Sequence, residues 1–224
     1  MLTELRDGVW WYECTGVNAY LVADGDGLTV VDAGTPLDAA RVKAAVDAAG
    51  FDREDVTRIL VTHYDLDHVG AVAKPSIDAP VYVGRADADL LTGAACPGVA
   101  GPKPFLQSVL GPFIPDVDGD RVHPVADGDA IGGFTACHTP GHTPGHVAYV
   151  HADRTVALVG DLVVERAGAL RASPWYLSYD AERARKSVAD LDDRAPDFEA
   201  LGMGHGTPFE RGGRGKLAAL ADSL

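Results

Sequence analysis

Four side chains that can bind a metal ion lie within six residues of one another. The apolar segment 59–61 is followed closely by His63, Asp65, Asp67 and His68, within the sequence Thr-His-Tyr-Asp-Leu-Asp-His. Such an apolar segment is typical of a buried strand, so the four residues begin at a strand end. Two carboxylates and two imidazoles this close would repel one another or lie in solvent unless the loop folded around a neutralising group. The pattern therefore predicts a metal-binding loop.

Three more residues of these kinds follow other apolar segments along the chain. His142 lies at the centre of the sequence His-Thr-Pro-Gly-His-Thr-Pro-Gly-His. Asp161 follows the segment 156–160, and His205 lies in a Gly-His-Gly sequence. Each is in a loop after a predicted strand, where functional residues concentrate. This favours one shared metal site over a solvated turn.

The remaining histidines have weaker sequence context. His138 and His146 lie on either side of His142, and we expect them to support it or to pack rather than to bind metal. His123 and His151 belong to no motif, and we expect both to be ordinary surface residues.

Apolar segments and helical patterns together predict a mixed α/β chain. Residues 35–49 carry a helix signal, with Thr35 as N-cap, proline in the first turn and a stop at Gly50. The spacing of apolar residues predicts another helix over 181–191. Segments rich in valine, leucine and tyrosine predict strands at 20–22, 28–31, 59–61, 81–83, 134–137, 147–150, 156–159 and 200–202.

No linker divides the sequence, so we expect residues 1–224 to form a single domain. Segment 93–115 is irregular, because four glycines and five prolines alternate with large apolar residues. A long loop of this kind is usually functional or lies at an interface, so we expect a lid over a substrate or a contact between two subunits of a homodimer. Trp175 and Tyr176 are expected to form the opposite wall of a substrate pocket or to pack in the core.

The composition excludes several classes of protein. The formal net charge is −14, which would repel nucleic acid, and no apolar run is long enough to span a bilayer. Without a secretory signal, cytoplasmic residence is expected. The three cysteines have no C-x-x-C spacing and are expected to be reduced thiols. The 26 Asp against 7 Glu, with 5 Lys against 14 Arg, favour a halophilic protein whose carboxylates keep it soluble in salt.

Taken together, these motifs resemble those of the metallo-β-lactamase-fold hydrolase superfamily. The main motif of that superfamily is H-x-H-x-D-H, followed by single His, Asp and His ligands in that order. Residues 18–21 and 31–34 resemble its opening hairpin. The resemblance implies a four-layer αββα sandwich with metal ions on loops along one edge.

The resemblance also implies roles for individual residues. Asp32 resembles the structural carboxylate that holds the metal loop by hydrogen bonds, although it could instead cap a strand end. The first metal ion would be held by His63, Asp65 and His142, the second by Asp67, His68 and His205, and Asp161 would bridge the two.

Asp65 departs from the superfamily pattern, which usually has histidine at this position. Aspartate is an anionic oxygen ligand with a shorter reach than imidazole. Two divalent ions, three aspartates and a bridging hydroxide sum to zero charge, whereas the histidine version keeps one positive charge. A less positive site tolerates iron or manganese better, so we expect two divalent ions, zinc first and iron or manganese as alternatives.

Such a site favours hydrolysis of a small-molecule substrate by a metal-bridging hydroxide. Asp67 is the predicted catalytic carboxylate, because one of its oxygens stays free to take the proton of the water. The apolar segment 93–115 favours a small ester, thioester, lactone or amide. A mononuclear iron sulfur dioxygenase-like enzyme and a noncatalytic metal-binding relative are the alternatives.

Overall fold

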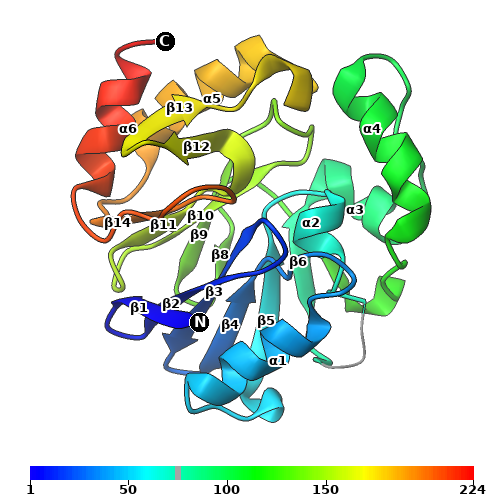
Figure 1. Cartoon of the computed structure of the whole chain (residues 1–224), viewed down its shortest axis with the longest axis vertical. Helices are drawn as coiled ribbons and strands as arrows, with labels where there is room; N and C mark the ends of the chain where they lie inside the picture. Colours follow the sequence, from blue (N-terminus) through cyan, green and yellow to red (C-terminus); the bar gives the residue numbers. More distant parts are fainter. Residues whose placement is uncertain (74–76) are drawn as a thin grey trace.

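The computed structural model describes residues 1–73 and 77–224, which form two facing β-sheets with helices outside them (Figure 1). The first sheet has the strand order β1-β2-β3-β4-β5-β6-β7. Neighbouring strands are antiparallel from β1 to β4 and parallel from β4 to β7. The strands are β1 (Leu2–Arg6), β2 (Val9–Glu13), β3 (Asn18–Asp24), β4 (Gly27–Val31), β5 (Val56–Val61), β6 (Val81–Gly84) and β7 (Val122–Val125).

The second sheet has the strand order β14-β11-β10-β9-β8. Strands β11 and β14 are parallel, and the other neighbours are antiparallel. A separate antiparallel hairpin, β12–β13, follows β11 in the chain. The strands are β8 (Ala130–Ile131), β9 (Phe134–His138), β10 (Val147–His151), β11 (Val156–Leu158), β12 (Val163–Arg166), β13 (Ala169–Ala172) and β14 (Ala200–Gly202).

Buried apolar side chains join these elements into four layers. Leu60 and Tyr149 belong to the core between the two sheets. A second core packs the first sheet against one set of helices, and a third packs the second sheet against another. The αββα sandwich implied by the sequence is thus confirmed. The first set is α1 (Ala39–Ala48), α2 (Leu66–Val69) and α3 (Arg85–Leu91); the second is α5 (Ala181–Arg194) and α6 (Gly213–Ala221).

Helix α5 begins where the apolar spacing predicts, at Ala181. The carboxylate of Asp180 accepts a hydrogen bond of 2.9 Å from the backbone N–H of Arg183 and so caps the helix. Val188 and Leu191 are buried on its inner face. The helix ends at Arg194, three polar residues beyond the predicted end. Across the described ranges, no helix has both the length and the apolar character needed to cross a bilayer.

Helix α1 begins three residues later than predicted, so the assignment of Thr35 as N-cap is wrong. Asp38 stands before the first helical residue, Ala39. Its carboxylate accepts hydrogen bonds from the backbone N–H groups of Thr35 (2.9 Å) and Thr15 (3.1 Å). These bonds hold residues 35–38 in a turn against the loop that follows β2.

Segment 93–115 contains α4 (Pro102–Leu110), although the sequence predicted an irregular loop. Pro102 occupies the first helical turn, where its missing N–H leaves no hydrogen bond unmade. Phe105 is exposed, whereas Lys103 and Gln107 are buried, at 3% exposure each. Helix α4 stands at the side of the sandwich (Figure 1). Its Lys103 and Gln107 side chains both contact Asp65.

The prediction that His151 lies on the surface is wrong. His151 is 2% exposed, and its Nε2 lies 2.7 Å from the carboxylate of Asp24 in β3. The two residues are far apart in the sequence, so no local pattern indicates the pair. His123 is exposed as expected and stacks on Tyr82.

Carboxylates dominate the charge of the chain, with 33 acidic residues against 19 lysines and arginines. Salt screens repulsion between like charges on a surface. We therefore expect the melting temperature to rise between 0.1 M and 2 M KCl by about 5 °C, equivalent to about 2 kcal/mol for a chain of this size. Differential scanning calorimetry would measure this rise. A flat or falling melting temperature would contradict the halophilic character expected from the aspartate bias.

Candidate metal centre

Four chain segments carry the seven predicted metal ligands to one edge of the sandwich. The first sheet contributes the segment that follows β5 and includes α2. The second sheet contributes the β9–β10 loop, the 3-10 turn after β11 and the loop after β14. Loops at strand ends are free to present side chains to a common space, and a rigid sandwich fixes their positions. The ligands they carry are His63, Asp65, Asp67 and His68, then His142, Asp161 and His205.

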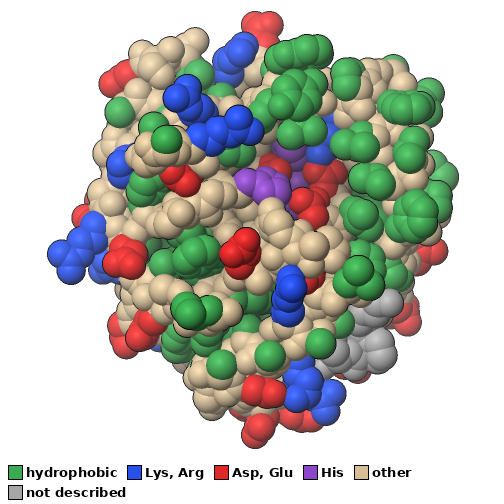
Figure 2. All heavy atoms as spheres, viewed as in Figure 1, with side chains coloured by type: hydrophobic (Ala, Val, Ile, Leu, Met, Phe, Trp, Pro, Cys, Tyr) green, Lys and Arg blue, Asp and Glu red, His purple; other side chains and the backbone are tan. Residues whose placement is uncertain are grey.

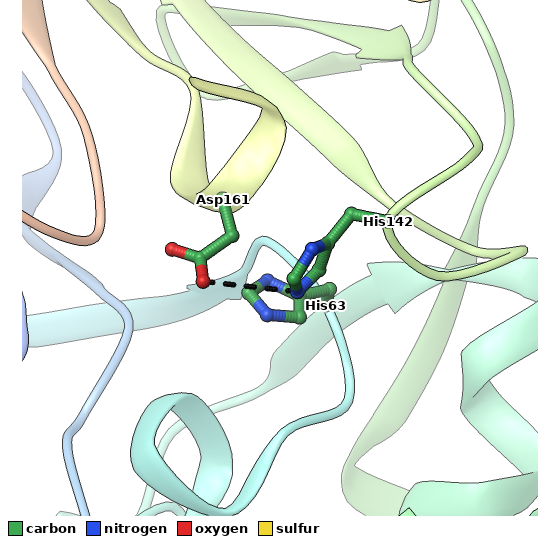
Figure 3. Close-up of side chains that lie close together, drawn as sticks. All are labelled: His63, His142 and Asp161. Carbon is green, nitrogen blue, oxygen red and sulfur yellow. Dashed lines mark ion pairs between the residues drawn. The ribbon is translucent and has the colours of Figure 1, made fainter. Parts of the chain in front are cut away.

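Six of these residues form two groups of three. Within each group, the ligand atoms lie within 4.8 Å of one another. In the first group the side chains converge on a common point from three segments (Figure 3). The carboxylate of Asp161 lies 3.7 Å from Nε2 of His142 and 3.3 Å from Nε2 of His205. It therefore stands between the groups, where a shared ligand is expected. The first group is His63, His142 and Asp161; the second is Asp67, His68 and His205.

The second group contains buried atoms whose chemistry fits a divalent ion. Nδ1 of His68 lies 2.8 Å from the carboxylate of Asp32, which leaves Nε2 facing Asp161. His68 Nε2 and Asp161 Oδ1 are 3.5 Å apart, and neither makes a hydrogen bond to any described residue. Buried polar atoms rarely stay unpaired, and imidazole nitrogen and carboxylate oxygen are common zinc ligands. These residues therefore fit a metal ion.

Asp65 lies beside the first group and is held by α4. Its Oδ2 lies 3.1 Å from Nε2 of His63 and 3.2 Å from Nε2 of His142. The same oxygen forms an ion pair with Lys103, while Oδ1 accepts a hydrogen bond of 2.7 Å from Gln107. Burial alone would raise the pKa of Asp65, but Lys103 and His63 hold it well below its usual value. Asp65 is therefore an anion whose two oxygens are both engaged.

A pocket of about 240 Å³ opens onto these residues. In the space-filling view, histidine and carboxylate side chains lie in a hollow bordered by hydrophobic side chains (Figure 2). Trp175 and Tyr176 do not line it or fill the core as expected, because they are 66% and 48% exposed; Leu177 lines it instead. The polar lining is Asp65, Asp67, Lys103, Gln107, His142, Asp161 and His205, and the apolar lining is Leu66, Leu106, Leu110, Ile114 and Leu177.

Comparison with known families shows which superfamily the chain belongs to. The sequence matches the family model of the metallo-beta-lactamase superfamily over residues 12–205, a range that begins in β2 and includes every predicted ligand. The chain belongs to the metallo-β-lactamase superfamily. At the level of this family it is a metal-dependent hydrolase.

Relatives and solved structures agree with this assignment. The chain is 30% identical to the uncharacterized protein YobT of Bacillus subtilis over 87% of each chain. It is 27% identical to the probable metallo-hydrolase YflN of the same organism, over 100% of this chain and 96% of the relative. The fold is similar to the Rm3 metallo-beta-lactamase, with a TM-score of 0.74, 23% identity and coverage of 99% and 91%. It is also similar to TTHA1623 in a di-iron-bound form, with a TM-score of 0.71, 29% identity and coverage of 93% and 95%.

Asp32 holds the metal loop of this superfamily member, as the resemblance implied. Its carboxylate accepts hydrogen bonds of 2.8 Å from both the backbone N–H and the hydroxyl group of Thr62. The same carboxylate contacts Nδ1 of His68 at 2.8 Å, so one side chain fixes the strand end and orients a ligand. The backbone of Asp32 has φ 57°, a left-handed conformation that aspartate tolerates better than most residues.

Asp87 ties the two ligand-bearing loops together and was not identified from the sequence. It lies in α3 and is completely buried. Its carboxylate accepts hydrogen bonds from the backbone N–H groups of Tyr64 (2.9 Å) and Gly145 (2.8 Å), and from the hydroxyl group of Thr143 (2.7 Å). The loop that contains His63 is thereby fixed relative to the loop that contains His142. Burial raises the pKa of Asp87 despite these bonds.

Lys103 and Gln107 were also missed, although a signal for them exists. They are four residues apart, which places both side chains on one face of a helix. Recognising Pro102 as a helix start would have predicted that face. The hydroxyl group of Tyr179 donates a hydrogen bond of 2.6 Å to Oε1 of Gln107, which fixes the amide orientation.

His146 and His138 belong to neither group of ligand atoms. His146 is buried, its Nδ1 lies 2.8 Å from the hydroxyl group of Thr139, and its ring centroid is 5.1 Å from that of His63. His138 contacts the carbonyl oxygen of Pro144 at 3.0 Å through Nε2. The contacts of His146 and His138 with neighbouring protein atoms are those of residues that pack or support the site.

Charges within the site set the protonation of its members. Burial, with the neighbouring carboxylates of Asp65 and Asp161, raises the pKa of Asp67. Burial and the neighbouring His68 lower the pKa of His63 to about 3. Contact with Asp161 raises the pKa of His205. A ligand imidazole must be neutral, so metal binding at the second group is coupled to proton release.

Gly204 keeps the space beside the second group open. A Cβ at this position would lie 2.0 Å from Oδ1 of Asp161 and 2.8 Å from Cε1 of His68. We expect Gly204→Ala to displace both side chains and weaken metal binding about 10- to 100-fold, as other changes around metal ligands do. Isothermal titration calorimetry with Zn²⁺ would measure this. Gly98→Ala, where a Cβ meets nothing within 4 Å, is the matched control, and equal affinities for the two variants would contradict the prediction.

Proposed function

We propose that this chain hydrolyses a small, partly apolar ester, thioester, lactone or amide in the pocket beside the metal ligands. The observation that carries the proposal is the composition of that pocket, in which carboxylate and imidazole groups face an apolar wall from α4. A small apolar acyl group would pack on Leu106, Leu110 and Ile114 while its carbonyl carbon faced Asp67 and His205. The excess of carboxylates on the chain disfavours polyanionic substrates.

Asp67, His68, His205 and Asp161 are the residues that would hold the required ion, with zinc as the first candidate and iron or manganese as alternatives. A divalent ion bound there would lower the pKa of a water molecule and polarise the carbonyl group of the substrate. Asp32 orients His68, and the carbonyl oxygen of Gly16, 2.9 Å from Nδ1, orients His205.

Asp67 is the proposed catalytic carboxylate. It is half-buried in the pocket lining, and its Oδ2 lies 3.6 Å from Nε2 of His205. One carboxylate oxygen of Asp67 faces the other candidate metal ligands. The second oxygen is available to accept the proton of the attacking water and later to pass it to the leaving group.

The sequence predicts a second metal ion, with a hydroxide bridging the two ions. This second ion would need Asp65 and His142 as ligands in addition to His63. Both Asp65 and His142 contact Lys103. The proposed reaction needs only the ion at Asp67, His68, His205 and Asp161, so the presence of a second ion is a separate question.

The experiment is a panel of substrates that contains p-nitrophenyl esters, acyl thioesters, γ- and δ-lactones, simple amides and a β-lactam. The protein is loaded with Zn²⁺, Mn²⁺ or Fe²⁺, and each substrate is assayed at low and at high KCl. We expect hydrolysis of at least one class, lost after chelation. We expect Asp67→Asn to lower kcat about 10²- to 10⁴-fold, as loss of a positioned proton acceptor does. Asp153→Asn, an exposed carboxylate in a distant turn, is the control.

Two outcomes of the panel would count against the proposal. Metal-loaded protein that hydrolyses nothing would favour a noncatalytic metal-binding relative. Iron-loaded protein that consumes oxygen with a sulfur compound, and hydrolyses nothing, would favour a dioxygenase.

A further inference from the structure

Helix α4 holds both oxygens of the substituted ligand Asp65. Gln107 donates its amide N–H to Oδ1 at 2.7 Å, and Lys103 donates its ammonium group to Oδ2. The two α4 side chains are 3% exposed, so neither contact is an occasional surface pairing. A buried ammonium group needs a charged partner, and Asp65 supplies it.

Lys103 also contacts a second expected ligand of the first group. Its Nζ lies 3.1 Å from Nε2 of His142, while Nδ1 of His142 lies 3.1 Å from the hydroxyl group of Ser173. If Nδ1–H donates to Ser173, Nε2 carries the lone pair that accepts from Lys103. In that tautomer the ammonium group uses a lone pair of Asp65 Oδ2 and the lone pair of His142 Nε2, both of which a metal ion would require.

A metal ion and this ammonium group would compete for the same atoms. An ion bound to Asp65 Oδ2 and His142 Nε2 would lie about 2 Å from each. It would then stand beside Nζ of Lys103, and two cations this close repel strongly in a buried site.

The second group differs from the first in this respect. His68 Nε2 and Asp161 Oδ1 lie buried with no hydrogen-bond partner among residues 1–73 and 77–224. Among the described residues, no lysine or arginine forms an ion pair with Asp67, His68, His205 or Asp161. Nδ1 of His68 pairs with Asp32, and the remaining pairs join imidazoles to Asp67 or Asp161. The lone pairs of the second group are therefore available to an ion, whereas those of Asp65 and His142 are not.

We infer that the ammonium group of Lys103 replaces one of the two metal ions of the superfamily site, so that the chain binds a single ion at Asp67, His68, His205 and Asp161. The inference rests on the metal-dependent function proposed above, but it concerns the number of ions and not the substrate. The aspartate at position 65 and the buried lysine on α4 then act as a pair, because each neutralises the charge of the other.

The test is the number of ions per chain, measured by elemental analysis of metal-saturated, desalted protein and by calorimetric titration of chelated protein with Zn²⁺. We expect one ion in the wild-type chain and two in Lys103→Met, which frees the first group. Lys43→Met, which removes an exposed lysine paired with Asp47, is the control and should bind one. Two ions in the wild-type chain, or one in a folded Lys103→Met variant, would overturn the inference.

Single ligand variants locate the ion and do not depend on the folding of Lys103→Met. We expect His205→Ala to bind no ion and His63→Ala to keep one, with circular dichroism to confirm that each is folded. The reverse result would overturn the inference. A wild-type chain with one ion and no hydrolytic activity would reject the proposed function alone, whereas a hydrolase with two ions would reject the inference alone.

Discussion

Asp161→Ala is expected to remove the metal ion and to lower kcat/KM about a thousandfold, since a metal supplies several kcal/mol and each 1.4 kcal/mol corresponds to about tenfold. The carboxylate of Asp161 lies within 3.3 to 3.7 Å of imidazole nitrogens from His68, His142 and His205. Among the described residues, no other carboxylate forms ion pairs with imidazoles of both ligand groups. Its loss would leave three imidazoles without the anion that draws them together.

The measurement combines metal content with steady-state kinetics on a substrate found in the panel. Asp161→Asn keeps the size of the side chain but removes its charge, and we expect it to lose most of the metal as well. Asp153→Ala, in the turn after β10, is the control. Full metal content in a folded Asp161→Ala variant would show that this carboxylate is not a ligand.

Asp65→Ala is expected to destabilise the protein by about 3–5 kcal/mol, because it leaves the ammonium group of Lys103 buried without a partner. For a chain of this size, each kcal/mol lowers the melting temperature by about 2–4 °C. Gln107 would also lose the acceptor of a buried hydrogen bond. Urea denaturation of chelated protein would measure the free energy of unfolding.

The double variant Asp65→Ala/Lys103→Met separates this explanation from a general loss of packing. It removes both charges, so we expect it to be more stable than Asp65→Ala alone. Asp47→Ala breaks an exposed pair with Lys43 and should change the free energy of unfolding by no more than about 1 kcal/mol. A double variant that is less stable than Asp65→Ala would contradict a buried Lys103 ion pair.

The clustering of the candidate ligands could be predicted because its signal is local. His63, Asp65, Asp67 and His68 follow one strand, and each later ligand also follows an apolar segment that folds as a strand. The apolar period of 181–191 likewise located α5 to within a few residues. In these cases the residues that determine the structure are close together in the sequence.

Contacts between distant segments could not be predicted in this way. Asp38 accepts hydrogen bonds from Thr15, 23 residues earlier, and thereby delays the start of α1. His151 is buried because Asp24 pairs with it across the sandwich. Lys103 is a surface residue by type, and only the fold places it against Asp65. These contacts depend on tertiary packing. Spacing can place Lys103 and Gln107 on one face of a helix, but it does not show what that face packs against.

The most direct test of the central claim is activity as a function of bound metal. Chelated protein would be titrated with Zn²⁺, or with the ion found in the purified protein, while hydrolysis and metal content are followed in the same samples. We predict no hydrolysis without metal and a linear return of activity that saturates at one ion per chain. Hydrolysis that survives complete removal of metal would contradict the account.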